Sequence, residues 1–208
     1  MKHNEYFLKE AEGKQAIFRL ADNQRVSDWF DYIYCEHLLN GKSEFYIASV
    51  VIKGKTQFDT KRKYAIFHIS GKQISNWCND ISFKSGLITG SSNYFIAEEG
   101  FFKAIFDSTG KRISDWHSII STEGLVSGQS DYYIADVKNS FAIFHVSGKQ
   151  ISKPYSYIVP HGFVKGQSDY YIAKLRKNHY AIFHYSGERI TKYFKYIYSE
   201  GLVEGESE

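Results

Sequence analysis

A short apolar motif recurs five times along this chain at nearly constant spacing. Each copy reads Ala-Ile-Phe, and the copies begin at Ala16, Ala65, Ala104, Ala142 and Ala181. A period of about 40 residues indicates a repeat architecture, in which each unit buries its apolar face against its neighbours. We therefore expect most of the repeated residues to be scaffold.

The repeats span nearly the whole chain, so we expect one domain over residues 1–208. Of these residues, 43% are hydrophobic, 17% are aromatic and only two are proline. Aromatic residues favour strands. The expected repeats are residues 6–44, 45–93, 94–131, 132–169 and 170–208.

Charge and cysteine content exclude little. The net charge of +3 does not by itself indicate nucleic acid. Two cysteines, Cys35 and Cys78, are too few for a disulfide framework, so a reduced compartment is favoured. No secretory signal or membrane-length apolar run is visible. We expect a cytoplasmic, monomeric protein without a cofactor.

Each repeat contains four segments that we interpret as strands. In the fourth copy of the motif they are Gly124–Gly128, Tyr132–Ala135, Phe141–Val146 and a segment from Ile151 to Ile158, with turns between them. The two middle segments are continuously apolar, which indicates burial on both faces of a sheet. Four strands in about 40 residues are typical of a β-propeller blade.

The two ends of the chain fall at different points of the repeat. The chain begins with a second strand, Tyr6–Leu8, and ends with a first strand, Gly201–Gly205. Pairing these ends would remove two open sheet edges. The sequence therefore predicts an all-β, five-bladed β-propeller of four-stranded blades, with the ring closed by the C-terminal strand. The alternative is an open solenoid or a twisted sheet of the same hairpins.

The repeat also resembles the WG-repeat (KWG-like) family of bacterial proteins. The segments that carry the resemblance are Tyr64–Ser75 and Gly86–Ile88, and similar segments cover nearly the whole chain. The Trp-Gly pair that names the family is replaced here by Ala-Ile. The resemblance implies a binding or scaffolding role, without a defined ligand or catalytic residue.

Three columns of equivalent residues invite a functional interpretation. The first column has a Ser or Thr in every repeat. Such a hydroxyl is more simply explained by a hydrogen bond to a backbone group than by a chemical role. The second holds Trp29, Trp77 and Trp116, which either pack between blades or form aromatic platforms for a sugar or a base. The third column includes three histidines. The ligands of one metal ion must converge on it, whereas these histidines are expected on different blades, so we expect no metal site. The hydroxyl column is Ser27, Ser75, Ser114, Ser152 and Thr191, and the third column is Arg19, His68, Asp107, His145 and His184.

No group of residues indicates catalysis. A glycosidase needs two carboxylates flanking one bond. The variable position of the expected first strand supplies a single carboxylate, Glu204, and we expect no enzyme. The column at this position reads Asn40, Thr89, Ser127, Lys165 and Glu204.

The clearest departure from the repeat is a longer loop in the second unit. Residues 49–63 exceed the equivalent loops by about ten residues and carry five cations against one acid, Asp59. Loops on a rigid scaffold often bind partners, and a basic loop fits an acidic protein or a phosphate backbone. In a propeller, this loop is expected on the same face as the links between blades. The predicted partner-binding residues are Lys53, Lys55, Lys61, Arg62 and Lys63 of the loop, with Tyr34, His37, Lys84 and His161 of the links. The alternative is a solvated hairpin tip.

The favoured function is a non-enzymatic binding module that engages a protein or ribonucleoprotein through one loop-bearing face. Such a module could inhibit a larger assembly, for example as a phage counter-defence factor, and RNA binding through the basic loop is a related hypothesis. The alternatives are a sugar-binding lectin with sites between blades and a glycosidase-like enzyme. Exposed cations in the Ser-Gly-Lys turns, such as Lys72, Lys111 and Lys149, form a second basic surface that solvation alone accounts for.

Overall fold

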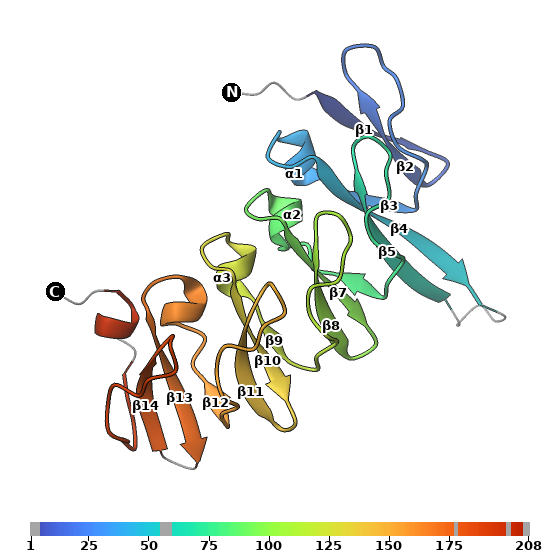
Figure 1. Ribbon diagram of the computed structural model, residues 1–208. Helices are drawn as coiled ribbons and strands as arrows, with labels where there is room; N and C mark the ends of the chain where they lie inside the picture. The colour runs from blue at the N-terminus through green and yellow to red at the C-terminus, as the bar shows by residue number, and fades with distance from the viewer. Residues whose placement is uncertain (1–4, 55–59, 177–178, 199–200, 206–208) are drawn as a thin grey trace. The chain divides into compact units, whose positions relative to one another are not determined.

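The computed structural model describes residues 5–54, 60–176, 179–198 and 201–205 (Figure 1). The fold is all-β, and its strands pair antiparallel. The described residues form one two-stranded and four three-stranded sheets, none of them closed. The chain divides into two compact units, one of residues 1–101 and 105–112 and the other of residues 102–104 and 113–208.

The elements of the first half alternate hairpins with short helical turns. In chain order they are β1 (Tyr6–Ala11), β2 (Lys14–Arg19), β3 (Tyr32–Tyr34), α1 (Glu36–Leu39), β4 (Phe45–Lys53), β5 (Thr60–His68), β6 (Asp80–Ile81), α2 (Gly86–Thr89), β7 (Tyr94–Glu99) and β8 (Phe102–Asp107).

The second half continues the same pattern. Its elements are β9 (Ile120–Ser121), α3 (Glu123–Val126), β10 (Tyr132–Val137), β11 (Ser140–His145), β12 (Tyr157–Ile158), η1 (Gly162–Lys165), β13 (Tyr170–Arg176), β14 (His179–His184) and η2 (Gly201–Val203).

The apolar motif forms the second strand of each hairpin, and in the first four copies its Ala and Ile side chains, which point to opposite faces, are 0% exposed, as predicted. In β4 and β5, Ile47 lies opposite Ile66 and Ala48 opposite Ala65. All four side chains are at most 1% exposed. Burying one isoleucine side chain contributes roughly 1.5–3 kcal/mol, so five such hairpins supply most of the apolar core.

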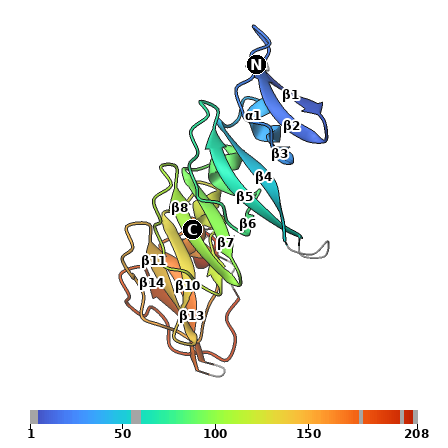
Figure 2. The same ribbon diagram turned by 90° about the vertical axis from the view of Figure 1, so that its right-hand side faces the viewer.

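The predicted fourth strand is divided between two sheets. After the hairpin turn the chain runs back beside β5 through single bridges, with Gln73 opposite Phe67 and Cys78 opposite Tyr64. It then crosses at once to the next hairpin, where Ile81 in β6 pairs with β7. The regular sheets therefore have at most three strands, and the return segment adds a bridged fourth. Figure 2 shows the hairpins from the side.

The predicted first strands are helical turns, and this corrects the sequence interpretation. In α3, the N–H of Gln129 donates to the carbonyl of Gly124 at 2.9 Å, while Gly128 has a φ of +74°. A left-handed glycine with this bond ends a helix. The predicted C-terminal closing strand, Gly201–Gly205, begins with the 3-10 turn η2, so it provides no strand to close a ring.

No helix among the described residues has the length and apolar character needed to cross a membrane.

Candidate interaction surfaces

The hydroxyl column serves the scaffold, as predicted. The N–H of Ile66 donates to Ser75 Oγ at 2.9 Å, and the N–H of Ile143 donates to Ser152 Oγ at the same distance. Thr191 accepts from Ile182 at 3.0 Å. Each hydroxyl satisfies a strand N–H that the ladder leaves unpaired.

The histidine column is likewise used in the hairpin turns. His68 Nδ1 lies 2.8 Å from Ser70 Oγ and accepts the N–H of Ser70 at 3.1 Å. Asp107 takes this place in the third repeat, where its Oδ1 accepts the N–H of Thr109 at 2.9 Å. Among the described residues, no group of three or more His, Cys, Asp or Glu side chains could hold a metal ion.

The tryptophans that have ring contacts pack against strand aromatics. Trp29 lies 6.1 Å from Phe18, and Trp77 lies 6.0 Å from Phe67 and 6.2 Å from Phe30, measured between ring centroids. Such edge and tilted contacts are typical of packed aromatic residues.

The variable column of the expected first strands, Asn40, Thr89, Ser127, Lys165 and Glu204, lies at the ends of the helical turns instead. Thr89 and Ser127 donate to carbonyls of their own turns at 3.2 and 3.0 Å. Lys165 forms an ion pair with Glu123 at 2.8 Å. These partners tie the column to local structure.

The long loop predicted from sequence is an extended hairpin. Strands β4 and β5 have nine residues each, whereas the β1–β2 and β10–β11 hairpins have six per strand. We define the arm as residues 50–53 of β4 and 60–63 of β5. Ile52 is 51% exposed, and Lys53, Lys61 and Arg62 are exposed beside it.

Among the described residues, the strands that flank the arm stop pairing with it before its last residues. On the β4 side, β3 pairs only as far as Ser49, and Asp31 Oδ2 then accepts the N–H of Val51 at 2.6 Å. On the β5 side, the bridge from Tyr64 to Cys78 is the last backbone pairing among the described residues. Open edges beyond these points can pair with another chain.

The predicted cations of the arm separate into two groups. Lys63 is drawn into the fold, because its Nζ lies 2.9 Å from Glu99 Oε1 and 2.5 Å from Asn79 Oδ1. Within the described part of the chain, Lys53, Lys61 and Arg62 form no ion pair. Lys55 lies outside the described residues.

The link residues of the first unit form a separate aromatic patch. Tyr34 lies 4.8 Å from Phe83 and 6.3 Å from His37, between ring centroids. Burial, followed by the Glu36 carboxylate, raises the pKa of Tyr34, so its hydroxyl remains a donor at neutral pH. Lys84 follows Phe83 and is exposed, whereas His161 belongs to the second unit.

The arm and this patch do not share a face, contrary to the sequence-based prediction. Tyr34 pairs with Ile47 near the start of β4, and Lys53 of the arm lies at the other end of this strand. Six residues of strand span about 20 Å. The links instead lie at the same strand ends as the Ser-Gly-Lys turns, because Phe45 pairs with His68.

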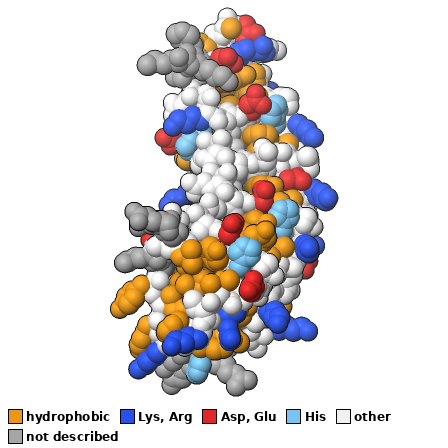
Figure 3. All heavy atoms as spheres, turned by 60° about the vertical axis from the view of Figure 1, so that its left-hand side comes forward, with side chains coloured by type: hydrophobic (Ala, Val, Ile, Leu, Met, Phe, Trp, Pro, Cys, Tyr) orange, Lys and Arg blue, Asp and Glu red, His pale blue; other side chains and the backbone are white. Residues whose placement is uncertain are grey.

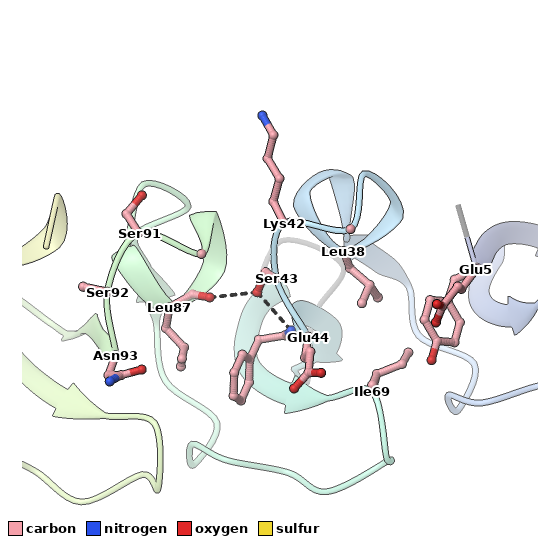
Figure 4. A pocket seen from close by; sticks show the side chains of 14 residues that line it. Glu5, Leu38, Lys42, Ser43, Glu44, Ile69, Leu87, Ser91, Ser92 and Asn93 are labelled. Atoms are coloured by element: carbon pink, nitrogen blue, oxygen red, sulfur yellow. Dashed lines mark hydrogen bonds between the residues drawn. The ribbon is translucent and has the colours of Figure 1, made fainter. Parts of the chain in front are cut away.

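A polar groove lies between the first and second repeats, with a volume of about 520 Å³. Ser43 Oγ donates to the carbonyl of Leu87 at 2.8 Å and accepts the N–H of Phe45 at 3.0 Å, which ties the two repeats together. Figure 4 shows the Lys42 side chain pointing away from these residues, with Ser91 and Asn93 to one side of Ser43 and Glu5 to the other. An equivalent groove of about 450 Å³ lies between the third and fourth repeats.

Both thiols are buried and unpaired. Burial raises the pKa of Cys35 to about 11 and, with the Glu99 charge, that of Cys78 to about 12. Thiols with such pKa values are protonated at neutral pH and are poor nucleophiles or metal ligands.

Comparison with known proteins gives structural similarity without sequence similarity. No family model matches the chain, and no curated protein matches its sequence. Similar solved structures include the C-terminal WD40 domain of Sif2 (TM-score 0.36, 7% identity, 93% of this chain and 58% of that chain) and a eukaryotic initiation factor (0.42, 12%, 93% and 55%). A third is the WD40 β-propeller domain of Doa1 (0.32, 8%, 91% and 64%). The chain spans less than two thirds of each of these three structures.

Proposed function

We propose that this protein is a non-enzymatic binding module that engages a macromolecular partner through the arm. The observation that carries the proposal is the composition of the arm, where Lys61 lies opposite the half-exposed Ile52, and Lys53 and Arg62 are exposed on the other face of the hairpin. Exposed cations together with an exposed apolar residue suit an acidic surface on a protein or a ribonucleoprotein. The partner would gain backbone pairing from the open strand edges.

The rigid base of the arm supports this role. The hairpin is anchored by Tyr46, Ala48 and Ala65, which are at most 1% exposed. The ion pair between Lys63 and Glu99 and the bond from Val51 to Asp31 fix the arm where it leaves the sheet. A preorganised strand pair loses less conformational entropy on binding than a flexible loop.

In its finer form the proposal is that the module inhibits a larger assembly, as a phage counter-defence factor would. The thiols are buried and the hydroxyl column is hydrogen-bonded within the scaffold, so neither group supports a chemical role. A module with these properties would act by covering a surface of its partner. Adding the protein to an activity assay of the captured partner tests this form, and unchanged activity at saturation would refute inhibition.

A lectin is the second candidate, because the two grooves recur between repeats. The first groove is lined by hydroxyl and amide groups from Ser43, Ser91, Ser92 and Asn93. Sugars are bound by such groups together with an aromatic face. A glycan array tests this candidate, and the absence of binding to every sugar would exclude it.

The test of the arm uses a charge-removal variant and a matched control. Lys53, Lys61 and Arg62 are replaced by glutamine in the variant, and Lys72, Lys111 and Lys149 are replaced in the control. All six side chains are exposed, so neither set should affect folding. On immobilised RNA and on an acidic polypeptide, the arm variant should elute at lower salt than both the wild type and the control. Equal elution of the two variants would show that net charge alone, and not the arm, gives retention.

A further inference from the structure

The turn between β7 and β8 carries the most exposed large hydrophobic side chain among the described residues. Gly100 and Phe101 form this two-residue turn, and Phe101 is 92% exposed. The equivalent turns of the β1–β2 and β10–β11 hairpins have Gly13 and Asn139 in its place, which are residues that turns favour. The turn itself therefore does not require a phenylalanine.

The strand that leads to this turn ends beside the base of the arm. Lys63 Nζ lies 2.9 Å from Glu99 Oε1, and the N–H of Asn79 donates to Glu99 Oε2 at 3.1 Å. At the other end, Ser43 before β4 donates to the carbonyl of Leu87 before β7. Contacts at both ends thus hold β4 and β7 pointing the same way. All of these residues belong to the first compact unit.

Two exposed cations of the arm lie on the face that is turned toward β7. Ile47 of β4 and Ile66 of β5 share a buried cluster with Phe95 of β7. Side chains alternate between the two faces of a strand. Lys53 and Arg62 are separated from these isoleucines by even numbers of residues, so they continue the same face beyond its packed part.

These two cations retain their charge without a local partner. At the base of the arm, Glu99 pairs with Lys63, and Asp31 accepts a backbone N–H of β4 at 2.6 Å. Lys53 and Arg62 form no ion pair in the part of the chain that the structure describes. They are therefore available to carboxylates of a partner.

The surroundings of the arm favour a protein over a single-stranded nucleic acid as this partner. Surfaces that bind single strands combine a continuous positive groove with successive aromatic platforms. Here Phe101 is one ring, and the carboxylates of Asp31 and Glu99 interrupt the positive charge at the base of the arm. A protein can place its own carboxylates only where the cations are, and an apolar pocket where the ring is.

We propose that Phe101 and the arm bind the same protein partner, with Phe101 in an apolar pocket and with Lys53 and Arg62 against carboxylates at the rim of that pocket. This inference rests on the proposed function and narrows its partner to a protein with these two features. Aromatic and arginine side chains are enriched among the residues that dominate protein interfaces. The ion pair between Lys63 and Glu99 holds the two contact elements together, so the partner meets a preorganised surface.

A matched control comes from a part of the surface where charges of both signs are mixed. His68 Nε2, for example, lies 3.3 Å from Glu44 Oε2, and on the face that Figure 3 shows, Asp and Glu side chains lie beside His, Lys and Arg side chains. Leu20 is 62% exposed and follows the end of β2 that is remote from its hairpin turn. Leu20→Ser therefore removes an exposed apolar side chain of the same unit without touching the arm.

Binding to poly-glutamate, to a random copolymer of glutamate and tyrosine and to poly(U) tests the proposal. The copolymer adds apolar rings to the carboxylates, so the wild type should bind it more tightly than poly-glutamate. Phe101→Ser should weaken binding to the copolymer at least about tenfold, as loss of an aromatic anchor does, and binding to poly-glutamate by no more than about twofold. Phe101→Trp should retain the wild-type binding, and Leu20→Ser should behave as the wild type.

The outcomes separate this inference from the proposed function. Equal binding of Phe101→Ser and the wild type to the copolymer would overturn the inference and leave the arm as the binding element. An equal loss on poly(U) and on the copolymer would also overturn it, because a stacked base would then be the ligand of Phe101. The variant with Lys53, Lys61 and Arg62 replaced by glutamine should lose binding to both polypeptides. If this variant binds both as the wild type does, or if the wild type binds neither, the proposed function itself is wrong.

Discussion

At the scale of single residues, the positions that recur in every repeat provide hydrogen bonds to the backbone or allow two backbone segments to pack closely. They do not provide reactive groups. The scaffold role of Ser75 and Ser152 could be predicted because an identical hydroxyl in every unit suits a geometric need. The helical turns were not predicted, because a short apolar pair such as Leu125 and Val126 fits a strand or a helix equally well. The glycine that follows each turn was the available signal, since glycine commonly ends a helix.

Ser152→Ala should lower the free energy of unfolding by about 1–3 kcal/mol, because the N–H of Ile143 would be buried without a partner. Ser152→Thr should restore most of this loss, since Thr191 fills the same place in the fifth repeat. Urea denaturation measures both changes. A loss with threonine as large as that with alanine would show that packing, not the hydrogen bond, matters there.

Gly166→Ala should be more destabilising than Gly187→Ala. Both glycines have a positive φ, so each alanine incurs a backbone cost of about 1 kcal/mol. At Gly166 the new Cβ would also lie 2.1 Å from the carbonyl oxygen of Gln129, whereas at Gly187 no atom lies within 4 Å. Equal melting temperatures for the two variants would contradict the tight contact between the third and fourth repeats.

Asp107 should make the stability of the protein depend on pH in the acidic range. Burial acts to raise the pKa of this carboxyl, but hydrogen bonds from Thr109 and Lys111 outweigh it and lower the pKa. A lowered folded-state pKa stabilises the protein above the unfolded pKa of about 3.9, and the stabilisation is lost as the pH falls through the folded value. Asp107→Ala should therefore destabilise the protein at pH 7, and the difference from the wild type should shrink toward pH 3. Denaturation at both pH values measures this difference, and a constant difference would refute the assignment.

At the scale of elements, the hairpin is the unit that the sequence predicts best and the arm is its main variation. Continuous apolar runs identified both strands of each hairpin, because a strand buried on both faces lacks alternation. The position of the arm could not be predicted, since the propeller model placed the loop and the links on one face. The observed pairing of Phe45 with His68 sets them at opposite strand ends.

Shortening the arm to the length of the other hairpins should leave stability nearly unchanged. The shortened hairpin would lose little buried surface, because the residues removed include the exposed Ile52, Lys53, Lys61 and Arg62. The new turn should join Val50 to Lys63, because this junction keeps Lys63 and its ion pair with Glu99. Thermal unfolding should show a melting temperature close to that of the wild type. A large decrease would make the arm part of the scaffold.

At the scale of the whole molecule, the repeat period predicted an all-β array, and the helical turns remove the strand that was to close it. Ring closure depends on small rotations between neighbouring repeats, which side-chain types along one repeat do not specify. The proposed interaction site followed from a departure from the repeat, the long hairpin. The pairing of Lys63 with Glu99 could not be foreseen, because these residues are brought together by adjacent sheets.

Affinity purification from native lysate, with the wild type and the arm-shortened protein side by side, tests the central claim most directly. Mass spectrometry of the bound fraction should identify a partner with an acidic surface that is retained by the wild type and lost on shortening. The control in which Lys72, Lys111 and Lys149 are replaced should retain it. If the shortened protein captures the same partner equally well, the arm is not the binding element and the proposed function is wrong.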